Sequence, residues 1–167
     1  MILVQSERCL ELAQVLQDYM VQNKLSISTA ESCTGGLVSG IFTHIPGSSE
    51  YYQGGVTSYS NQAKINVLGV NRDTLEAHGA VSAETAMEMA IGALKVFNSD
   101  FSISITGIAG PGGGSTNKPV GTIFIGLAKA GQSTWKKFSL GDDRLQNRSE
   151  ISYLALRELI DYTGCNS

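Results

Sequence analysis

Residues 25–46, LSISTAESCTGGLVSGIFTHIP, constrain the fold more than any other part of the chain. Apolar and small polar residues alternate over 25–30, which predicts a strand, and residues 35–45 have the apolar spacing of a helix that Pro46 stops. The stretch ESCTGG, residues 31–36, joins the two. A strand that enters a helix through a tight turn is typical of α/β proteins, in which helices cover a sheet.

The rest of the chain continues this alternation. We expect helices over 6–24, 61–69 and 82–97 and from Asp142 or Asp143 to Gly164, with Ser6 and Ser82 as caps. We expect strands over 51–60 and 100–107, and a late hairpin of strands 120–130 and 133–140 around Gly131. This order predicts a single three-layer α/β/α domain, residues 1–167, with a mixed, mainly parallel sheet.

Composition excludes several classes of function. The 12 basic and 15 acidic residues are scattered and give a net charge of -3, so we expect no nucleic-acid partner. No apolar stretch approaches the roughly 18–20 residues that span a bilayer, and the first residues lack the basic lead of a signal peptide. We therefore expect a cytoplasmic protein without a membrane partner.

Cysteine and histidine are scarce. Cys9, Cys33 and Cys165 form no CxxC pair, which argues against a disulfide framework and a zinc site, and we expect neither a metal nor a cofactor. His44 and His78, the two histidines, have no distinctive setting for a catalytic triad.

The turn at 31–36 offers two nucleophiles, the hydroxyl of Ser32 and the thiol of Cys33. The unpaired N–H groups at the start of a helix can hold a developing oxyanion, and Gly35 and Gly36 let a substrate approach the backbone. The alternative is that Ser32 or Thr34 only caps the helix.

Lys64 is the candidate base, because burial among small and apolar residues would lower its pKa toward neutrality. Tyr59 could hydrogen-bond across the same site. Alternatively, Lys64 is a solvated helix lysine and Tyr59 a strand aromatic. A short-chain dehydrogenase is excluded, because its tyrosine and lysine share one helical face at YxxxK, whereas these are five residues apart. No GK[ST] is present to make a P-loop.

The glycine-rich loop at 106–115 can present several N–H groups to an anion, or it is a flexible connection. Arg144 and Arg148, four residues apart at the start of the last helix, could clamp a phosphate or carboxylate, or form surface ion pairs with Asp143 or Glu150.

Six stretches in this order resemble the CinA carboxy-terminal domain family, whose active members are nicotinamide mononucleotide amidases: TAESCTGG, GGVTSYSNQAK, HGAVS, EMAIGAL, SITGIAGPGGG and KPVGT. The resemblance extends from about Leu10 to Leu159. It places the family's serine on Ser32, its tyrosine and lysine on Tyr59 and Lys64, and its threonine on Thr106. Where the family has GDR this chain reads GDDR, and the arginines that follow fall on Arg144 and Arg148.

The resemblance implies hydrolysis of the nicotinamide mononucleotide carboxamide by Ser32, with Lys64 as base and Tyr59 assisting. The expected substrate-binding residues are Glu31, Cys33, Thr34, Gly35, Thr106, Gly110, Gly112, Gly113, Arg144 and Arg148. Backbone N–H groups of 33–35 would hold the oxyanion, and the loop and an arginine the phosphate. Many relatives carry a second, amino-terminal domain, and we expect this chain to be the stand-alone form. We expect a homo-oligomer, with a dimer favoured. The alternative function is a catalytically silent nucleotide-binding module of the same fold.

Overall fold

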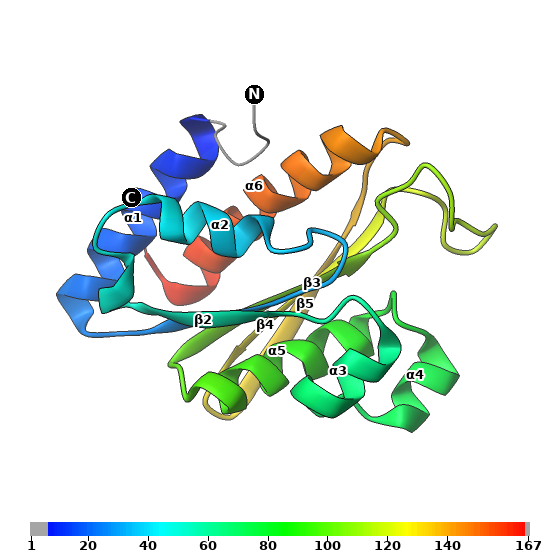
Figure 1. The fold of residues 1–167 in the computed structure, drawn as a ribbon, viewed down its shortest axis with the longest axis horizontal. Coiled ribbons are helices and arrows are strands. Elements are labelled where there is room, and N and C mark those ends of the chain that lie inside the picture. The colour runs from blue at the N-terminus through cyan, green and yellow to red at the C-terminus, as the bar shows by residue number, and fades with distance from the viewer. Residues whose placement is uncertain (1–6, 166–167) are drawn as a thin grey trace.

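The computed structural model describes residues 7–165, in which five strands form one sheet with the order β2-β1-β3-β4-β5 (Figure 1). Their bounds are β1 (Ile27–Glu31), β2 (Tyr52–Thr57), β3 (Phe101–Gly107), β4 (Thr122–Lys129) and β5 (Gln132–Ser139). β1 pairs in parallel with β2 and β3, whereas β4 is antiparallel to both β3 and β5. All strands except β4 thus run in one direction, which confirms the mixed, mainly parallel sheet.

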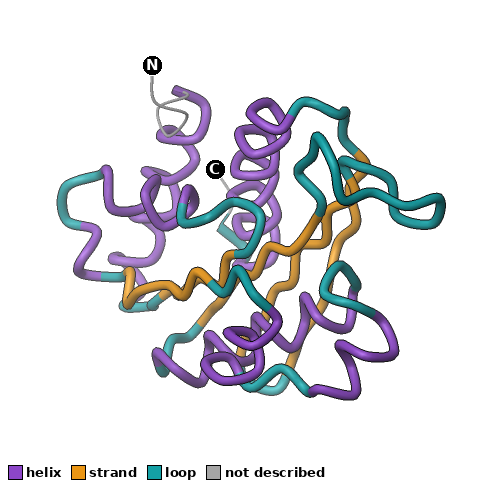
Figure 2. Tube along the Cα trace, turned by 45° about the vertical axis from the view of Figure 1, so that its right-hand side comes forward, coloured by secondary structure: helices purple, strands orange, loops and turns teal. Residues whose placement is uncertain are grey.

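Helices cover both faces of this sheet, as Figures 1 and 2 show. One face carries α1 (Glu7–Asn23), α2 (Leu37–His44) and α6 (Arg144–Thr163), and the other carries α3 (Asn61–Leu68), α4 (Arg72–His78) and α5 (Ala83–Phe97). A short 3₁₀ helix, Ser48–Glu50, precedes β2. The three-layer α/β/α architecture is therefore confirmed.

Capping residues in the sequence correctly predicted where most of the helices begin or end. Ser82 accepts a hydrogen bond from the Thr85 N–H at the start of α5, and Gly164 ends α6 in the left-handed conformation. Asp143, rather than Asp142, caps α6. The expected cap Ser6 lies outside the described residues. No helix was expected over the residues of α4, which Asn71 caps.

The two faces of the sheet are packed differently. The larger apolar cluster lies under α1, α2 and α6, while a smaller one on the opposite face includes Ala30, Leu68 and Met89. On this second face the hydroxyls of Ser102 and Ser104 donate to the carbonyls of Ala90 and Ala86 in α5. Small polar residues therefore hold α5 close to the strands.

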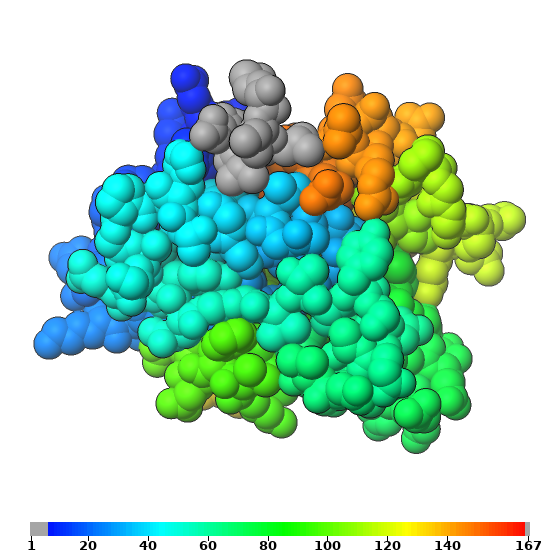
Figure 3. Space-filling model, in the orientation of Figure 1, coloured from blue at the N-terminus to red at the C-terminus, as the bar shows by residue number. Residues whose placement is uncertain are grey.

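The carboxyl ends of β1, β2 and β3 meet at one edge of the sheet, as those of parallel strands do. The segment after β1 contains residues 32–36, the segment after β2 leads into α3, and the segment after β3 is the glycine-rich loop. In Figure 3 the segment after β2 reaches the first turns of α6, drawn in orange. Three strand ends and one helix start thus meet at this edge.

We predict that Gly92→Ala destabilises the protein. Alanine is the better helix former by about 1 kcal/mol. A Cβ at position 92, however, would overlap the carbonyl oxygen of Leu68, the last residue of α3. Overpacking of this kind costs about 1–3 kcal/mol and should outweigh the gain in helix propensity. Urea unfolding followed by circular dichroism measures the change.

Gly141→Ala is the matched control, because a Cβ there meets nothing within 4 Å. Its unfolding midpoint should stay close to that of the wild type. A more stable Gly92→Ala variant would show that α3 can move away from α5 without cost.

Candidate active site

A cavity of about 280 Å³ opens at the edge where β1, β2 and β3 end. Small-molecule sites occupy about 300–1,000 Å³, so this volume suits a compact ligand. The lining brings together Ser32, Tyr59, Lys64, Thr106 and Arg144, residues from five separate segments of the chain. Cys33 and the backbone of Gly110, Gly112 and Gly113 also line it.

Lys64 is the centre of this arrangement. It exposes 1% of its surface, and its Nζ lies 3.1 Å from Ser32 Oγ and 2.7 Å from the carbonyl oxygen of Ser58. Burial lowers the pKa of Lys64 below its ordinary value of 10.5, because the charged form loses its hydration. The alternative of a solvated surface lysine is therefore wrong.

The geometry suits an uncharged amine that accepts a proton from Ser32. A neutral lysine has two N–H groups and one lone pair. When one N–H donates to the Ser58 carbonyl, the lone pair can face the Ser32 hydroxyl. Over residues 7–165 the recorded ion pair is His78–Glu84, so Lys64 has no carboxylate within 4.0 Å to hold its charge.

The neighbouring thiol of Cys33 is a poor nucleophile here. Burial, with a smaller contribution from the charge of Glu31, raises the pKa of Cys33 to about 12. Because the thiolate is the reactive form of cysteine, a thiol that stays protonated at neutral pH is inert. Between the two open candidates, the environment favours Ser32.

Glu31 lies outside the cavity, although we expected it among the substrate-binding residues. Its carboxylate is buried and accepts hydrogen bonds from the N–H groups of Gly36, Val38 and Ser39 and from the Ser39 hydroxyl. Glu31 thereby caps α2, and it is absent from the cavity lining. The expectation that it contacts the substrate is corrected, and so is the alternative that Ser32 or Thr34 caps α2.

The oxyanion donors are fewer than expected. The Gly35 N–H donates to the Ser32 carbonyl at 3.1 Å, and the Gly36 N–H is engaged by Glu31. The N–H groups of Cys33 and Thr34 donate to no backbone carbonyl within residues 7–165. These two remain available to an oxyanion that forms beside Ser32.

Tyr59 and Arg144 meet at the mouth of the cavity. Arg144 donates through Nη2 to the Tyr59 hydroxyl at 3.1 Å and through Nη1 to the Gly110 carbonyl at 2.9 Å. Tyr59 is 62% exposed, and its recorded hydrogen bond is to Arg144 rather than to Ser32 or Lys64. Within the described residues neither Arg144 nor Arg148 forms an ion pair, so the surface-pair alternative is wrong.

Comparison with known proteins agrees with this architecture. The sequence model of the CinA C-terminal domain family matches residues 10–163. A CinA-like protein of Chloroherpeton thalassium is 54% identical over 144 residues, which are 82% of this chain and 34% of that protein. A CinA-like protein of Fervidobacterium nodosum is 46% identical over 87% of this chain and 36% of its own length.

The chain belongs to the CinA C-terminal domain family. It spans about one third of the length of these curated relatives. Among solved structures, competence/damage inducible protein CihA from Agrobacterium tumefaciens superposes with a TM-score of 0.91 and 41% identity, covering 93% of this chain and 96% of that one. A CinA superfamily protein from Escherichia coli gives a TM-score of 0.89 at 31% identity over 92% of this chain and 90% of that one.

Arg148 in this CinA domain lies behind the turn rather than in the cavity. Its Nη2 donates to the carbonyl oxygen of Thr34 at 2.7 Å, and it is absent from the lining. Thr34 is fully buried and likewise lies outside the lining, as does Gly35. Arg148 therefore supports the turn that contains Ser32, whereas Arg144 lines the cavity.

The first residues of the glycine-rich loop are fixed by two side-chain hydrogen bonds. Thr106 donates through its hydroxyl to the Ala80 carbonyl at 2.7 Å. Asn147, which the sequence analysis missed, donates to the carbonyls of Ala109 and Gly141 at 3.0 and 2.8 Å. The available signal was its spacing, because Asn147 lies four residues before Ile151 on the buried face of α6. Asn61, also missed, lines the cavity.

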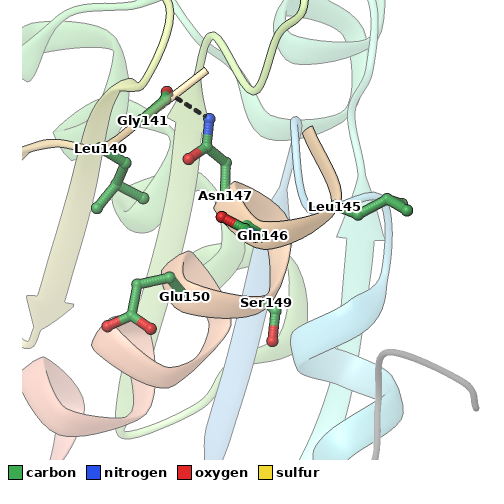
Figure 4. A pocket seen from close by; sticks show the side chains of 7 residues that line it. All are labelled: Leu140, Gly141, Leu145, Gln146, Asn147, Ser149 and Glu150. Atoms are coloured by element: carbon green, nitrogen blue, oxygen red, sulfur yellow. Dashed lines mark hydrogen bonds between the residues drawn. The ribbon is translucent and has the colours of Figure 1, made fainter. Parts of the chain in front are cut away.

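A second and larger cavity, about 520 Å³, lies at the start of α6 (Figure 4). Leu140, Leu145, Ser149 and Glu150 contribute to it, and Figure 4 shows the Asn147 amide pointing to Gly141 at its edge. Among its lining residues Glu150 is the one ionisable group, and no hydrogen bond joins its carboxylate to Ser149 in Figure 4. It lacks the nucleophile and base that the smaller cavity combines.

Separately, no helix within residues 7–165 is long and apolar enough to cross a membrane.

We predict that Lys64→Met changes how stability depends on pH. The folded-state pKa of Lys64 lies below the unfolded value of 10.5. Between these two values the unfolded chain binds more protons, so wild-type stability rises with pH and levels off above 10.5. The unfolding free energy of wild type minus that of Lys64→Met should therefore increase over this window, as measured by urea unfolding from neutral pH to pH about 10.5.

Lys136→Met, which removes an exposed lysine of β5, is the matched control. A difference between wild type and Lys64→Met that stays flat over the whole range would contradict a lowered pKa.

Proposed function

We propose that this CinA C-terminal domain hydrolyses the carboxamide of nicotinamide mononucleotide to nicotinic acid mononucleotide and ammonia. The observation that carries the proposal is the 3.1 Å contact between the buried Lys64 amine and Ser32 Oγ. Such a pair provides a nucleophile and its base without histidine or metal. The identity of the substrate rests on the resemblance of the six sequence stretches to the family's amidases.

The reaction begins when Ser32 Oγ attacks the carboxamide carbon and its proton passes to Lys64 Nζ. The Ser58 carbonyl holds one N–H of Lys64 and so keeps the accepting lone pair in place. The new oxyanion lies within the turn, where the N–H groups of Cys33 and Thr34 donate to no backbone carbonyl.

The tetrahedral intermediate then collapses. The carbon–nitrogen bond breaks as Lys64 returns its proton to the leaving nitrogen, and ammonia departs. Water attacks the resulting Ser32 ester, Lys64 takes the proton of that water, and the proton finally returns to Ser32 Oγ. One lysine thus acts as base and acid in both halves of the reaction.

The remainder of the nucleotide fits the polar end of the cavity. Arg144 and the backbone of Gly112 and Gly113 offer donors suited to the 5'-phosphate. Tyr59, at the mouth, offers a ring face to the cationic pyridine ring. The proposal includes action in the cytoplasm as part of pyridine nucleotide salvage, and assembly as a homodimer.

We predict that Ser32→Ala and Lys64→Ala each lower ammonia release from nicotinamide mononucleotide by roughly 10³-fold, because each removes one half of the proton-transfer pair. Cys33→Ser should lose far less, since the thiol stays protonated. The assay uses purified protein in buffer with chelator, and Ser149→Ala and Lys136→Met are matched controls outside the cavity.

A folded wild-type protein that releases no ammonia would contradict the amidase. Calorimetric binding of the nucleotide without turnover would then support the silent binding module. A dead Cys33→Ser variant, together with inactivation of the wild type by iodoacetamide, would assign the attack to the thiol.

We predict that Arg144→Ala raises KM for nicotinamide mononucleotide by about 10- to 100-fold, the range for losing a hydrogen bond to a charged group. The KM for nicotinamide riboside, which lacks the phosphate, should change little. Arg148→Ala is the comparison, because it loosens the turn and should affect both substrates alike. Equal effects of Arg144→Ala on the two substrates would remove Arg144 from the phosphate site.

A further inference from the structure

The buried hydroxyl of Ser58 makes no hydrogen bond to residues 7–165 in the resting protein. The residue is 0% exposed, and its Oγ has no hydrogen-bond partner among residues 7–165. Its backbone is fully committed: the N–H donates to the Glu31 carbonyl at 2.8 Å, and the carbonyl accepts from Lys64 Nζ at 2.7 Å. Burying an unpaired hydroxyl is unfavourable, so its presence beside the base requires an explanation.

The strands place this hydroxyl in one row with the nucleophile. Side chains alternate along a strand, and Val56 of β2 and Ala30 of β1 both pack in the apolar cluster on the α5 face. Ser58 and Ser32 lie two residues further along and therefore face the same side. The Ser58 N–H bonds to the Glu31 carbonyl, which extends the parallel ladder to this row.

Proton transfer increases the number of hydrogen-bond acceptors that Lys64 requires. A neutral lysine donates two hydrogen bonds, whereas its ammonium form donates three. Lys64 Nζ has two recorded partners, the Ser58 carbonyl and Ser32 Oγ, and the second is consumed when Ser32 attacks. The ammonium that forms in the reaction therefore lacks acceptors at the moment it carries a buried charge.

The other groups that face Lys64 do not meet this need. Cys33 from the turn, Tyr59 from the end of β2 and Arg144 from α6 line the same cavity, and none of them is a carboxylate. The segments 80–81 and 106–109 contribute no ionisable side chain to the lining, and the Thr106 hydroxyl already donates to the Ala80 carbonyl. Asn61 also lines the cavity but is exposed to solvent. The Ser58 oxygen, by contrast, is buried, has no hydrogen-bond partner among residues 7–165, and belongs to the residue whose carbonyl already contacts Lys64 Nζ.

We propose that Ser58 is a positioning residue for Lys64, whose side-chain oxygen accepts a hydrogen bond from the ammonium formed when Lys64 takes the proton of Ser32. This inference rests on the proposed amidase function for its kinetic consequence. Its electrostatic consequence concerns Lys64 alone and can be measured without substrate.

The test is Ser58→Ala, which removes an oxygen without breaking any hydrogen bond of the resting structure. We expect an unfolding midpoint equal to or above that of the wild type, because no interaction is lost. With nicotinamide mononucleotide, kcat should fall about 10- to 100-fold, as for a lost hydrogen bond to a charge, while KM stays unchanged. The ammonium form is stabilised less, so the acid limb of kcat should move to lower pH.

Ser104→Ala is the matched control. It removes a buried hydroxyl from the same face, but this hydroxyl donates to the Ala86 carbonyl. It should therefore lower the unfolding midpoint and leave the acid limb in place. Ser58→Ala with wild-type kcat and acid limb would overturn the proposal, and so would a variant that loses stability and kcat together without a shift of the limb.

Nuclear magnetic resonance titration of Lys64 in the free protein gives an answer even when ammonia release is absent. A lower Lys64 pKa in Ser58→Ala than in wild type supports the proposal, and equal values overturn it. A shifted pKa combined with inactive wild-type protein would retain the role of Ser58 and reject the amidase.

Discussion

The buried amine of Lys64, placed between Ser32 Oγ and the Ser58 carbonyl without a counter-ion, is the interaction on which the site depends. An ammonium on a protein surface is useless as a base at neutral pH, so the fold must remove water from this one group. The removal is achieved by α3, which follows β2 after three residues and lies against α5 through Leu68 and Gly92. The placement of α3 thus helps to bury the amine that we propose as the base.

The alternation of side chains along β1 keeps the carboxylate of Glu31 away from Lys64. Glu31 and Ser32 are adjacent, and a carboxylate beside Lys64 would hold the lysine in its charged form. Because neighbouring side chains leave a strand on opposite faces, Glu31 is directed to the α2 side, where four donors surround its carboxylate. The negative charge of Glu31 thereby interacts with the N–H groups at the start of α2 rather than with Lys64. The same arrangement occupies the Gly36, Val38 and Ser39 N–H groups, which leaves those of Cys33 and Thr34 for the oxyanion of the proposed reaction.

Local patterns were sufficient to predict much of the fold, whereas the site needed tertiary information. Alternation in β1, the nearly polar-free run of β3 and the caps of α5 and α6 are properties of short segments, and these elements were found. α4 was missed because seven residues carry little periodicity. Lys64 was proposed as the base, but its burial follows from contacts between α3 and α5 that no local pattern records. Glu31, Arg148 and Asn147 act through backbone groups of other segments, so their partners could not be read from spacing.

The first turns of α6 connect the parts of the site that the sheet edge alone leaves separate. Arg144 reaches the Gly110 carbonyl and the Tyr59 hydroxyl, Asn147 holds the glycine-rich loop at Ala109, and Arg148 holds the nucleophile turn at Thr34. Residues 144, 147 and 148 share one helical face, because positions three and four apart lie side by side. A rotation or shift of this helix would move the anion-binding donors and the turn of Ser32 together. In the proposed amidase reaction, this one helix would therefore set the distance between the phosphate and Ser32, which suits a reaction that needs the carboxamide at a fixed reach from a phosphate anchor.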